Sequence, residues 1–322
     1  MLIILQNQVE YIVTQPLLIR DCMIPGLATY ANAVNPWWSA GPAANNPINS
    51  TDVGFSIQID NSIVPLSHIP VHFFTHNTSA NPASLIKKWL PLYWIIKPDT
   101  RLLLTVDSAS LYATNQIQPQ LYMRGYTLRE DAVEHSILPK YIHSNQITHV
   151  YSAGTGFNSS VYFGTDTFMI GFSICRFVSD AITPTNILLS DLPTDIPPTE
   201  PVSPVFNITE VRPDGTTLSM TNQQNFRFAY GPYDGQFGRI NFFHRKMQRG
   251  QSLYLNVSGV IAPLPPWNIG DWYSLIVYCL DRDDIEALIS QPHLHRYLYP
   301  LFPSENIAYE MIQAIQEGVC RT

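Results

Sequence analysis

Charged residues are scarce in this chain of 322 residues. Asp, Glu, Lys and Arg make up 13% of the sequence, and the formal net charge at pH 7 is −7. Charged residues are about 25% of an average soluble domain. The densest basic stretch, His244–Arg249, is a single short cluster. Nucleic acid requires a more extended Lys/Arg surface. We therefore expect no direct contact with nucleic acid.

Long apolar runs and regular cysteine spacings are also missing. No run approaches the roughly 18 apolar residues of a membrane-spanning helix. The four cysteines, at positions 22, 175, 279 and 320, show no CxxC spacing, so they predict neither a disulfide framework nor a zinc site. Met1–Leu5 is apolar but lacks the basic region and cleavage site of a secretory signal. We expect the chain to be made and folded in a cytoplasm.

Motifs that carry chemistry are missing as well. The sequence contains no GxSxG, P-loop, GxGxxG or HExxH pattern. We therefore predict no enzyme activity, no catalytic residues, no cofactor-binding residues and no metal-binding residues. One alternative stays open: the acidic groups around Asp283 and Asp131 offer oxygen ligands that suit calcium. Capping of helices explains the same residues.

The clearest positive feature is an internal repeat with a period of about 150 residues. Three strand-like stretches recur in the same order in the two halves of the chain. The matched pairs are Phe55–Ile59 with Phe206–Glu210, Leu102–Ser108 with Leu253–Gly259, and Leu121–Leu128 with Tyr273–Leu280. A period of this length is that of a whole domain and not of a solenoid unit.

A short helix is predicted after the last strand of each half. Leu128–His143 and Leu280–His295 share five identical residues over sixteen positions. Both stretches contain an Asp followed three residues later by a Glu, at Asp131 and Glu134 and at Asp283 and Glu286. An Asp at the N-cap and a Glu three residues on satisfy the free N–H groups at a helix start.

Short strands separated by Pro, Asn and Asp turns indicate an all-β protein. We predict two tandem eight-stranded jelly-roll sandwiches, each with a short helix, plus a C-terminal helix. The predicted units are residues 1–146 and 147–322. A Pro-rich excursion spans 181–204, and an amphipathic helix spans 304–318.

Two stretches are candidate interfaces. The long connection from Pro25 to Thr51 carries Trp37 and Trp38, which either pack on a partner subunit or form a platform for a ligand. The C-terminal helix would present Ile307, Met311 and Ile315 on one face. A single amphipathic helix at a terminus commonly packs on its own core or on a neighbour.

Two eight-stranded units in tandem, each with a small helix, resemble the double jelly-roll major capsid proteins of the PRD1–adenovirus lineage. This chain would be a compact member, as in small lipid-containing bacteriophages. The resemblance implies a homotrimer whose six jelly rolls form a pseudo-hexagonal capsomer of an icosahedral virion. It also implies neighbouring capsomers, penton or minor capsid proteins as partners, and an internal viral membrane beneath the shell.

Two other classes of function remain open. One is a receptor-binding spike or adhesin of tandem β-sandwiches, with the tryptophans stacking on glycans. The other is a carbohydrate-active enzyme on a jelly-roll scaffold, since a fold does not fix a function.

Overall fold

The structure is a computed structural model. The residues that it describes are 1–23, 54–70, 75–77, 85–87, 89–106, 120–129, 132–143, 148–149, 157–177, 205–220, 224–225, 241–258 and 272–301. Trp37, Trp38, Asp131, the excursion 181–204 and the helix 304–318 with Ile307, Met311 and Ile315 therefore lie outside the described residues.

The first unit contains eight strands that pair as a jelly roll. They are β1 (Leu2–Gln6), β2 (Glu10–Ile12), β3 (Leu17–Met23), β4 (Gly54–Ile59), β5 (Ile63–Pro70), β8 (Leu90–Ile96), β9 (Arg101–Val106) and β10 (Gln120–Thr127). The first strand pairs with the eighth, the second with the seventh, the third with the sixth and the fourth with the fifth, all antiparallel. This gives two facing four-stranded sheets, β1-β10-β3-β8 and β5-β4-β9-β2, which is the jelly-roll arrangement. Two short strands, β6 (Thr75–Asn77) and β7 (Leu85–Lys87), form a separate hairpin.

The second unit repeats this pairing. Its strands are β11 (Lys140–His143), β12 (Thr148–His149), β13 (Phe157–Tyr162), β14 (Thr167–Phe177), β15 (Val205–Val211), β16 (Thr217–Ser219), β17 (Gln224–Asn225), β18 (Asn241–Met247), β19 (Ser252–Ser258) and β20 (Trp272–Asp281). Taking β11 with β12 as the first strand and β16 with β17 as the fifth, the same four antiparallel pairs form. The sheets are β18-β14-β20-β11 and β13-β19-β15-β16.

The repeat seen in the sequence is confirmed at the level of topology. β4 and β15 are the fourth strands of their units, β9 and β19 the seventh, and β10 and β20 the eighth. These are the three pairs of stretches that recur in the sequence. The division of the chain between residues 146 and 147 stays a prediction; β11 precedes that point, yet it pairs within the second unit's sheet.

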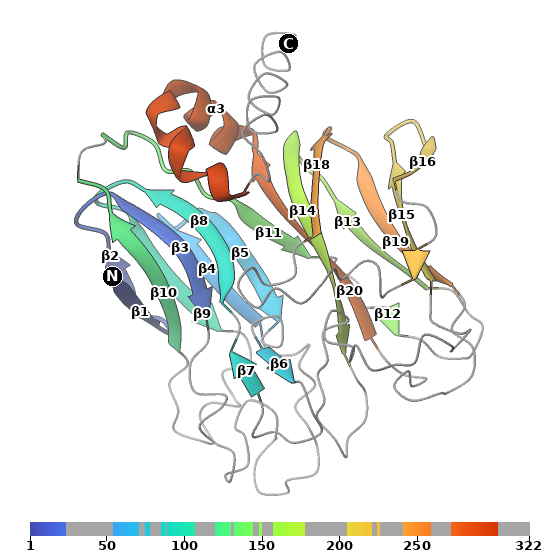
Figure 1. The fold of residues 1–322 in the computed structure, drawn as a ribbon, viewed down its shortest axis with the longest axis horizontal. Coiled ribbons are helices and arrows are strands. Elements are labelled where there is room, and N and C mark those ends of the chain that lie inside the picture. The colour runs from blue at the N-terminus through green and yellow to red at the C-terminus, as the bar shows by residue number, and fades with distance from the viewer. Residues whose placement is uncertain are drawn as a thin grey trace, which may run out of the picture.

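One continuous sheet joins the two units (Figure 1). β11 of the second unit runs parallel to β5 of the first, with Tyr141 opposite Leu66. The path β18-β14-β20-β11-β5-β4-β9-β2 therefore crosses the whole molecule. The outermost strand β1 alternates between core and solvent, with Ile3 and Leu5 buried and their neighbours exposed.

Helices are few. After β20 come α3 (Arg282–Ser290) and two 3₁₀ turns, η4 (Pro292–Tyr297) and η5 (Tyr299–Leu301). None of the helices in the described ranges is long and apolar enough to cross a membrane. Buried Ile285, Leu288 and Leu294 bring α3 and η4 into the same apolar core as the strands of the first unit.

Two sequence predictions need correction. The helix expected for the first unit does not form at residues 132–139. This segment is extended, and Ile137 forms an isolated β-bridge with Ile95. Tertiary hydrogen bonds, described below, replace the helical ones. The strand β1 was also missed, because Met1–Leu5 has no polar residues in alternation that would identify it as half-buried.

Gly125 occupies a β-bulge at which no side chain fits. The register of β10 against β3 shifts between Arg124 and Gly125. A Cβ atom at Gly125 would lie 2.2 Å from the carbonyl oxygen of Leu18. The strands would have to move apart to admit even a methyl group, since that oxygen belongs to the backbone.

We expect Gly125→Ala to lower the free energy of unfolding by about 1–3 kcal/mol, the usual range for overpacking. Gly164→Ala is the matched control, because a Cβ at Gly164 has no neighbour within 4 Å, and it should stay within about 0.5 kcal/mol of wild type. Urea unfolding followed by tryptophan fluorescence measures both. Equal, small effects of the two substitutions would show that the bulge tolerates a side chain.

Candidate functional site: the junction between the two units

The segment 132–139, called the connector below, is held on one side by β8 of the first unit. The N–H of Ile137 donates to the carbonyl of Ile95 at 2.8 Å, and the N–H of Ile95 donates back at 2.9 Å. The indole of Trp94 donates to the carbonyl of Pro139 at 2.7 Å. Trp94 is fully buried. The connector thus extends the edge of the first unit's sheet.

The other side of the connector is held by Gln291, at the end of α3. Its amide oxygen accepts from the backbone N–H groups of Glu134 and His135 at 2.8 and 3.3 Å. Its amide nitrogen donates to the carbonyls of His135 and Ala287 at 3.0 and 3.2 Å. Gln291 is only 2% exposed. One side chain therefore satisfies the backbone that a helix would otherwise have satisfied internally.

The start of α3 supplies the next contact. Asp281 is the N-cap and forms a capping box with Asp284, in which each side chain accepts from the other residue's N–H. The predicted capping pair Asp283 and Glu286 is wrong by two residues. Asp283 is exposed, and Glu286 pairs with Arg282 one turn earlier at 2.8 Å. Two overlapping Asp-x-x-acid patterns fit the sequence, and β20 simply ends at the earlier one.

Asp284 also reaches back to the connector. Its Oδ1 accepts from the N–H of Leu138 at 2.6 Å, while Asp281 forms an ion pair with Lys140 of β11. Burial, followed by the charge of Asp281, raises the pKa of Asp284 to about 8 against the opposing effects of Leu138 and Lys140. Burial also works against the charge of Asp281, yet Lys140 outweighs it and the pKa of Asp281 is lowered.

Two tyrosines of the second unit complete the junction. The ring of Tyr141 on β11 stacks on that of Tyr278 on β20, with centroids 4.5 Å apart. Their hydroxyls donate to the carbonyls of Pro91 and Leu92 on β8 at 2.7 and 2.6 Å. Burial raises the pKa of both well above its usual value. Both hydroxyls therefore stay protonated donors.

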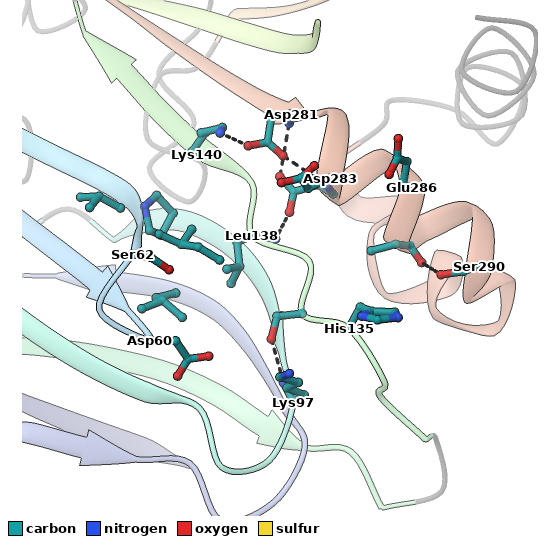
Figure 2. A pocket seen from close by; sticks show the side chains of 17 residues that line it. Asp60, Ser62, Lys97, His135, Leu138, Lys140, Asp281, Asp283, Glu286 and Ser290 are labelled. Carbon is teal, nitrogen blue, oxygen red and sulfur yellow. Dashed lines mark hydrogen bonds and ion pairs between the residues drawn. The ribbon is translucent and has the colours of Figure 1, made fainter. Parts of the chain in front are cut away.

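A cavity of about 740 Å³ lies beside these contacts (Figure 2). Its walls are the β4–β5 turn with Asp60, the connector with His135, β11 with Lys140, and the first turns of α3. Figure 2 shows Lys140 and Asp281 pointing toward one another. Within the described part of the chain, no three His, Cys, Asp or Glu side chains gather as a metal ion requires.

A second buried carboxylate lies inside the second unit. Glu210 on β15 is 1% exposed. It accepts from Gln251 at 3.0 Å and from Arg212 at 3.3 Å, and it forms an ion pair with Arg245 on β18. β15 and β18 belong to opposite sheets. This cluster therefore ties the two sheets of the second unit together.

Of the predicted residues, the structure brings Glu134, Asp283 and Glu286 to this junction. Glu134 contributes its backbone N–H group, and its side chain does not cap a helix as predicted. Gln291 and Tyr278 could not be recognised from the sequence, because each forms its hydrogen bonds with residues far along the chain. Gln291 donates to the carbonyl of His135, and Tyr278 donates to the carbonyl of Leu92. Two other tryptophans can be placed: Trp94 is in the core, and the guanidinium carbon of Arg124 lies 3.7 Å from the ring centroid of Trp89.

Comparisons with known proteins find likeness in structure alone. No protein-family model matches the chain, and no curated protein sequence matches it. A crystal structure of the major capsid protein of Sulfolobus turreted icosahedral virus aligns over 87% of this chain and 91% of its own, with 11% identity and a TM-score of 0.38. A chain from the atomic structure of the same virus aligns over 98% and 96%, with 10% identity and a TM-score of 0.38.

A β-porphyranase of glycoside hydrolase family 86 from Bacteroides plebeius aligns over 72% of this chain and 31% of its own. Its identity is 11% and its TM-score 0.18. The strand pairing of this chain, and not these likenesses, defines the double jelly roll.

We expect Gln291→Ala to lower the free energy of unfolding by about 1–3 kcal/mol, since it leaves partly buried N–H groups of the connector without partners. Gln248→Ala is the control, because the Gln248 side chain is exposed. Thermal unfolding compares the two. Equal melting temperatures would mean that the connector is not held by Gln291.

Proposed function

We propose that this chain is a viral major capsid protein. The observation that carries the proposal is the same eight-stranded jelly roll formed twice in one chain, with both copies fixed side by side in one continuous sheet. Jelly rolls occur mainly in capsid proteins, lectins and cupins. A shell needs wall units that hold their mutual angle, which the junction provides. A lectin or an enzyme does not need a second unit fixed in this way.

The chemistry of the described surface supports the same proposal. Two of the tryptophans that a glycan site could use are not free, since Trp94 is buried and Trp89 lies under Arg124. The low share of charged residues suits a protein whose surface becomes covered in an assembly, because charge is depleted at the centres of interfaces. We infer that the chain acts through contacts with other copies and not through catalysis.

Three copies would place six jelly rolls around a three-fold axis, and closed cyclic symmetry is the usual way for identical chains to associate. We propose that such trimers are the capsomers of an icosahedral shell. Neighbouring capsomers, penton or minor proteins and an internal membrane would be the partners of that shell. The virion would be the site of action, after synthesis in the host cytoplasm.

One described surface suits contact with another copy. β1 and β2 are edge strands of the two facing sheets, at the end of the first unit farthest from the second (Figure 1). Met1, Leu2, Ile4, Val9 and Ile12, here called the β1/β2 end, are all 44–53% exposed. Edge strands that face water are usually protected by charged side chains. The edge strand β1 carries the apolar side chains of Leu2 and Ile4 instead, which favours an edge that another copy of the chain covers.

The first test is the molar mass of the purified protein in solution, measured by light scattering. With a chain mass of 36.4 kDa, a trimer has a mass of about 109 kDa. We expect a stable species of that mass, or closed shells. A strict monomer at high concentration would contradict the trimer and favour the adhesin.

The second test adds a charge to the β1/β2 end. We expect Ile4→Lys to weaken association at least tenfold, since burying an unpaired ammonium in an interface is costly. The monomer should still fold, because Ile4 is 44% exposed. Thr217→Lys, which puts the same charge on the exposed strand β16, is the control. Equal dissociation constants for both variants would show that the β1/β2 end stays in water.

A further inference from the structure

The cluster of Asp281, Asp284 and Lys140 lies where three parts of the molecule meet. Asp281 ends β20 and caps α3, Lys140 begins β11, and Asp284 holds the N–H of Leu138 in the connector. Asp284 is only 6% exposed, and the side chains of Lys140 and Asp281 are 25% and 22% exposed. All three line the cavity of Figure 2, through which water reaches the outer two.

The charges of this cluster do not balance unless a proton is bound. Two carboxyl groups face one ammonium group, and Lys140 is engaged by Asp281. If both carboxyl groups were ionised, one negative charge would remain uncompensated at a buried position, which is strongly unfavourable. A proton on Asp284 makes the cluster neutral. The two carboxyl groups share a hydrogen bond, which also favours the proton.

The remaining groups around the cluster do not supply the missing positive charge. Asp283 and Glu286 on α3 and Asp60 on the β4–β5 turn are acidic, and Figure 2 shows Lys97 and His135 at the end of the cavity away from Lys140 and Asp281. Behind Asp284, the neighbouring groups are the buried Tyr278 and the buried thiol of Cys279. The Glu210 cluster is the opposite case, with two arginines for one carboxylate.

We propose that Asp284 is a proton-dependent latch that holds the connector to α3, and with it the first unit to the second. With the proton bound, the Asp281–Asp284–Lys140 cluster is neutral and the connector is fixed. Loss of the proton leaves a buried negative charge, and the connector detaches locally from α3. This property belongs to the single chain and does not depend on the proposed role in a capsid.

The direction of the pH effect follows from linkage. The pKa of Asp284 is about 8 in the folded protein and about 4 in an unfolded chain. The folded state therefore binds this proton more tightly, so the stability that Asp284 contributes falls as pH rises from about 4 to about 8 and is level above that. The lowered pKa of Asp281 acts only below about pH 4, and the raised pKa of Lys140 acts only above about pH 10. Neither overlaps this window.

The test is amide hydrogen exchange between pH 6 and pH 8, corrected for the intrinsic rate at each pH. We expect the protection of the Glu134, His135 and Leu138 amides to fall by up to about tenfold per pH unit, the slope for one linked proton. Amides of β15 next to Glu210 serve as the internal control and should show no such fall. Equal pH dependence at the two places would overturn the latch.

Substitutions sharpen the result. Asp284→Asn keeps an oxygen for the N–H of Leu138 but cannot ionise, so protection of the connector should become independent of pH. Asp283→Asn removes an exposed acid from the same helical turn and should retain the wild-type pH dependence. The latch is wrong if Asp284→Asn keeps the wild-type slope. If that variant does not fold, the wild-type comparison of connector and β15 still decides.

Discussion

A buried sheet edge is the constraint on which the rest of the molecule depends. β8 is the last strand of its sheet, and all seven of its residues are buried. The free N–H and C=O groups of such an edge must find partners away from water. They find them in the second unit and the connector: Ile137 pairs with Ile95, and two tyrosine hydroxyls donate to Pro91 and Leu92. The sheet of the first unit is therefore not complete without the second unit.

A backbone irregularity in β8 belongs to this arrangement. Tyr93 has a φ of 48°, in the left-handed region that residues other than glycine rarely occupy. The register against β3 shifts at the same place. The two carbonyls that accept from the tyrosines are those of the residues just before Tyr93. Local strain at Tyr93 thus coincides with the contact that fixes the two units.

The strand order of the fold could be anticipated because strands of one unit recur in the other. Phe55–Ile59 and Phe206–Glu210 hold equivalent positions, as their similar apolar patterns indicated. The connector could not be anticipated. Glu134 and the apolar residues around it suggest a helix when taken alone, and hydrogen bonds from distant residues such as Gln291, more than 150 positions away, make an extended backbone favourable. Patterns within a window report local preferences, and such long-range hydrogen bonds override them.

The candidate site was partly foreseen for the same reason. Acidic residues at the start of α3 follow from capping rules, which hold locally. Which of them is buried depends on where β20 ends and on the approach of Leu138 and Lys140. The imbalance of charge at Asp284 is thus a property of the assembled junction, and no segment shows it alone.

The dependence of β8 on later parts of the chain has a consequence for synthesis. A ribosome makes about 5–20 residues per second, so Ile96 leaves it on the order of ten seconds or more before Tyr278 and α3. During that interval the first jelly roll presents to solvent an apolar strand with one unpaired edge. In a cell making many copies at once, the first halves of neighbouring nascent chains compete for that edge with the second half still to come. Folding yield is then set by translation speed and crowding, and not by the stability of the finished molecule.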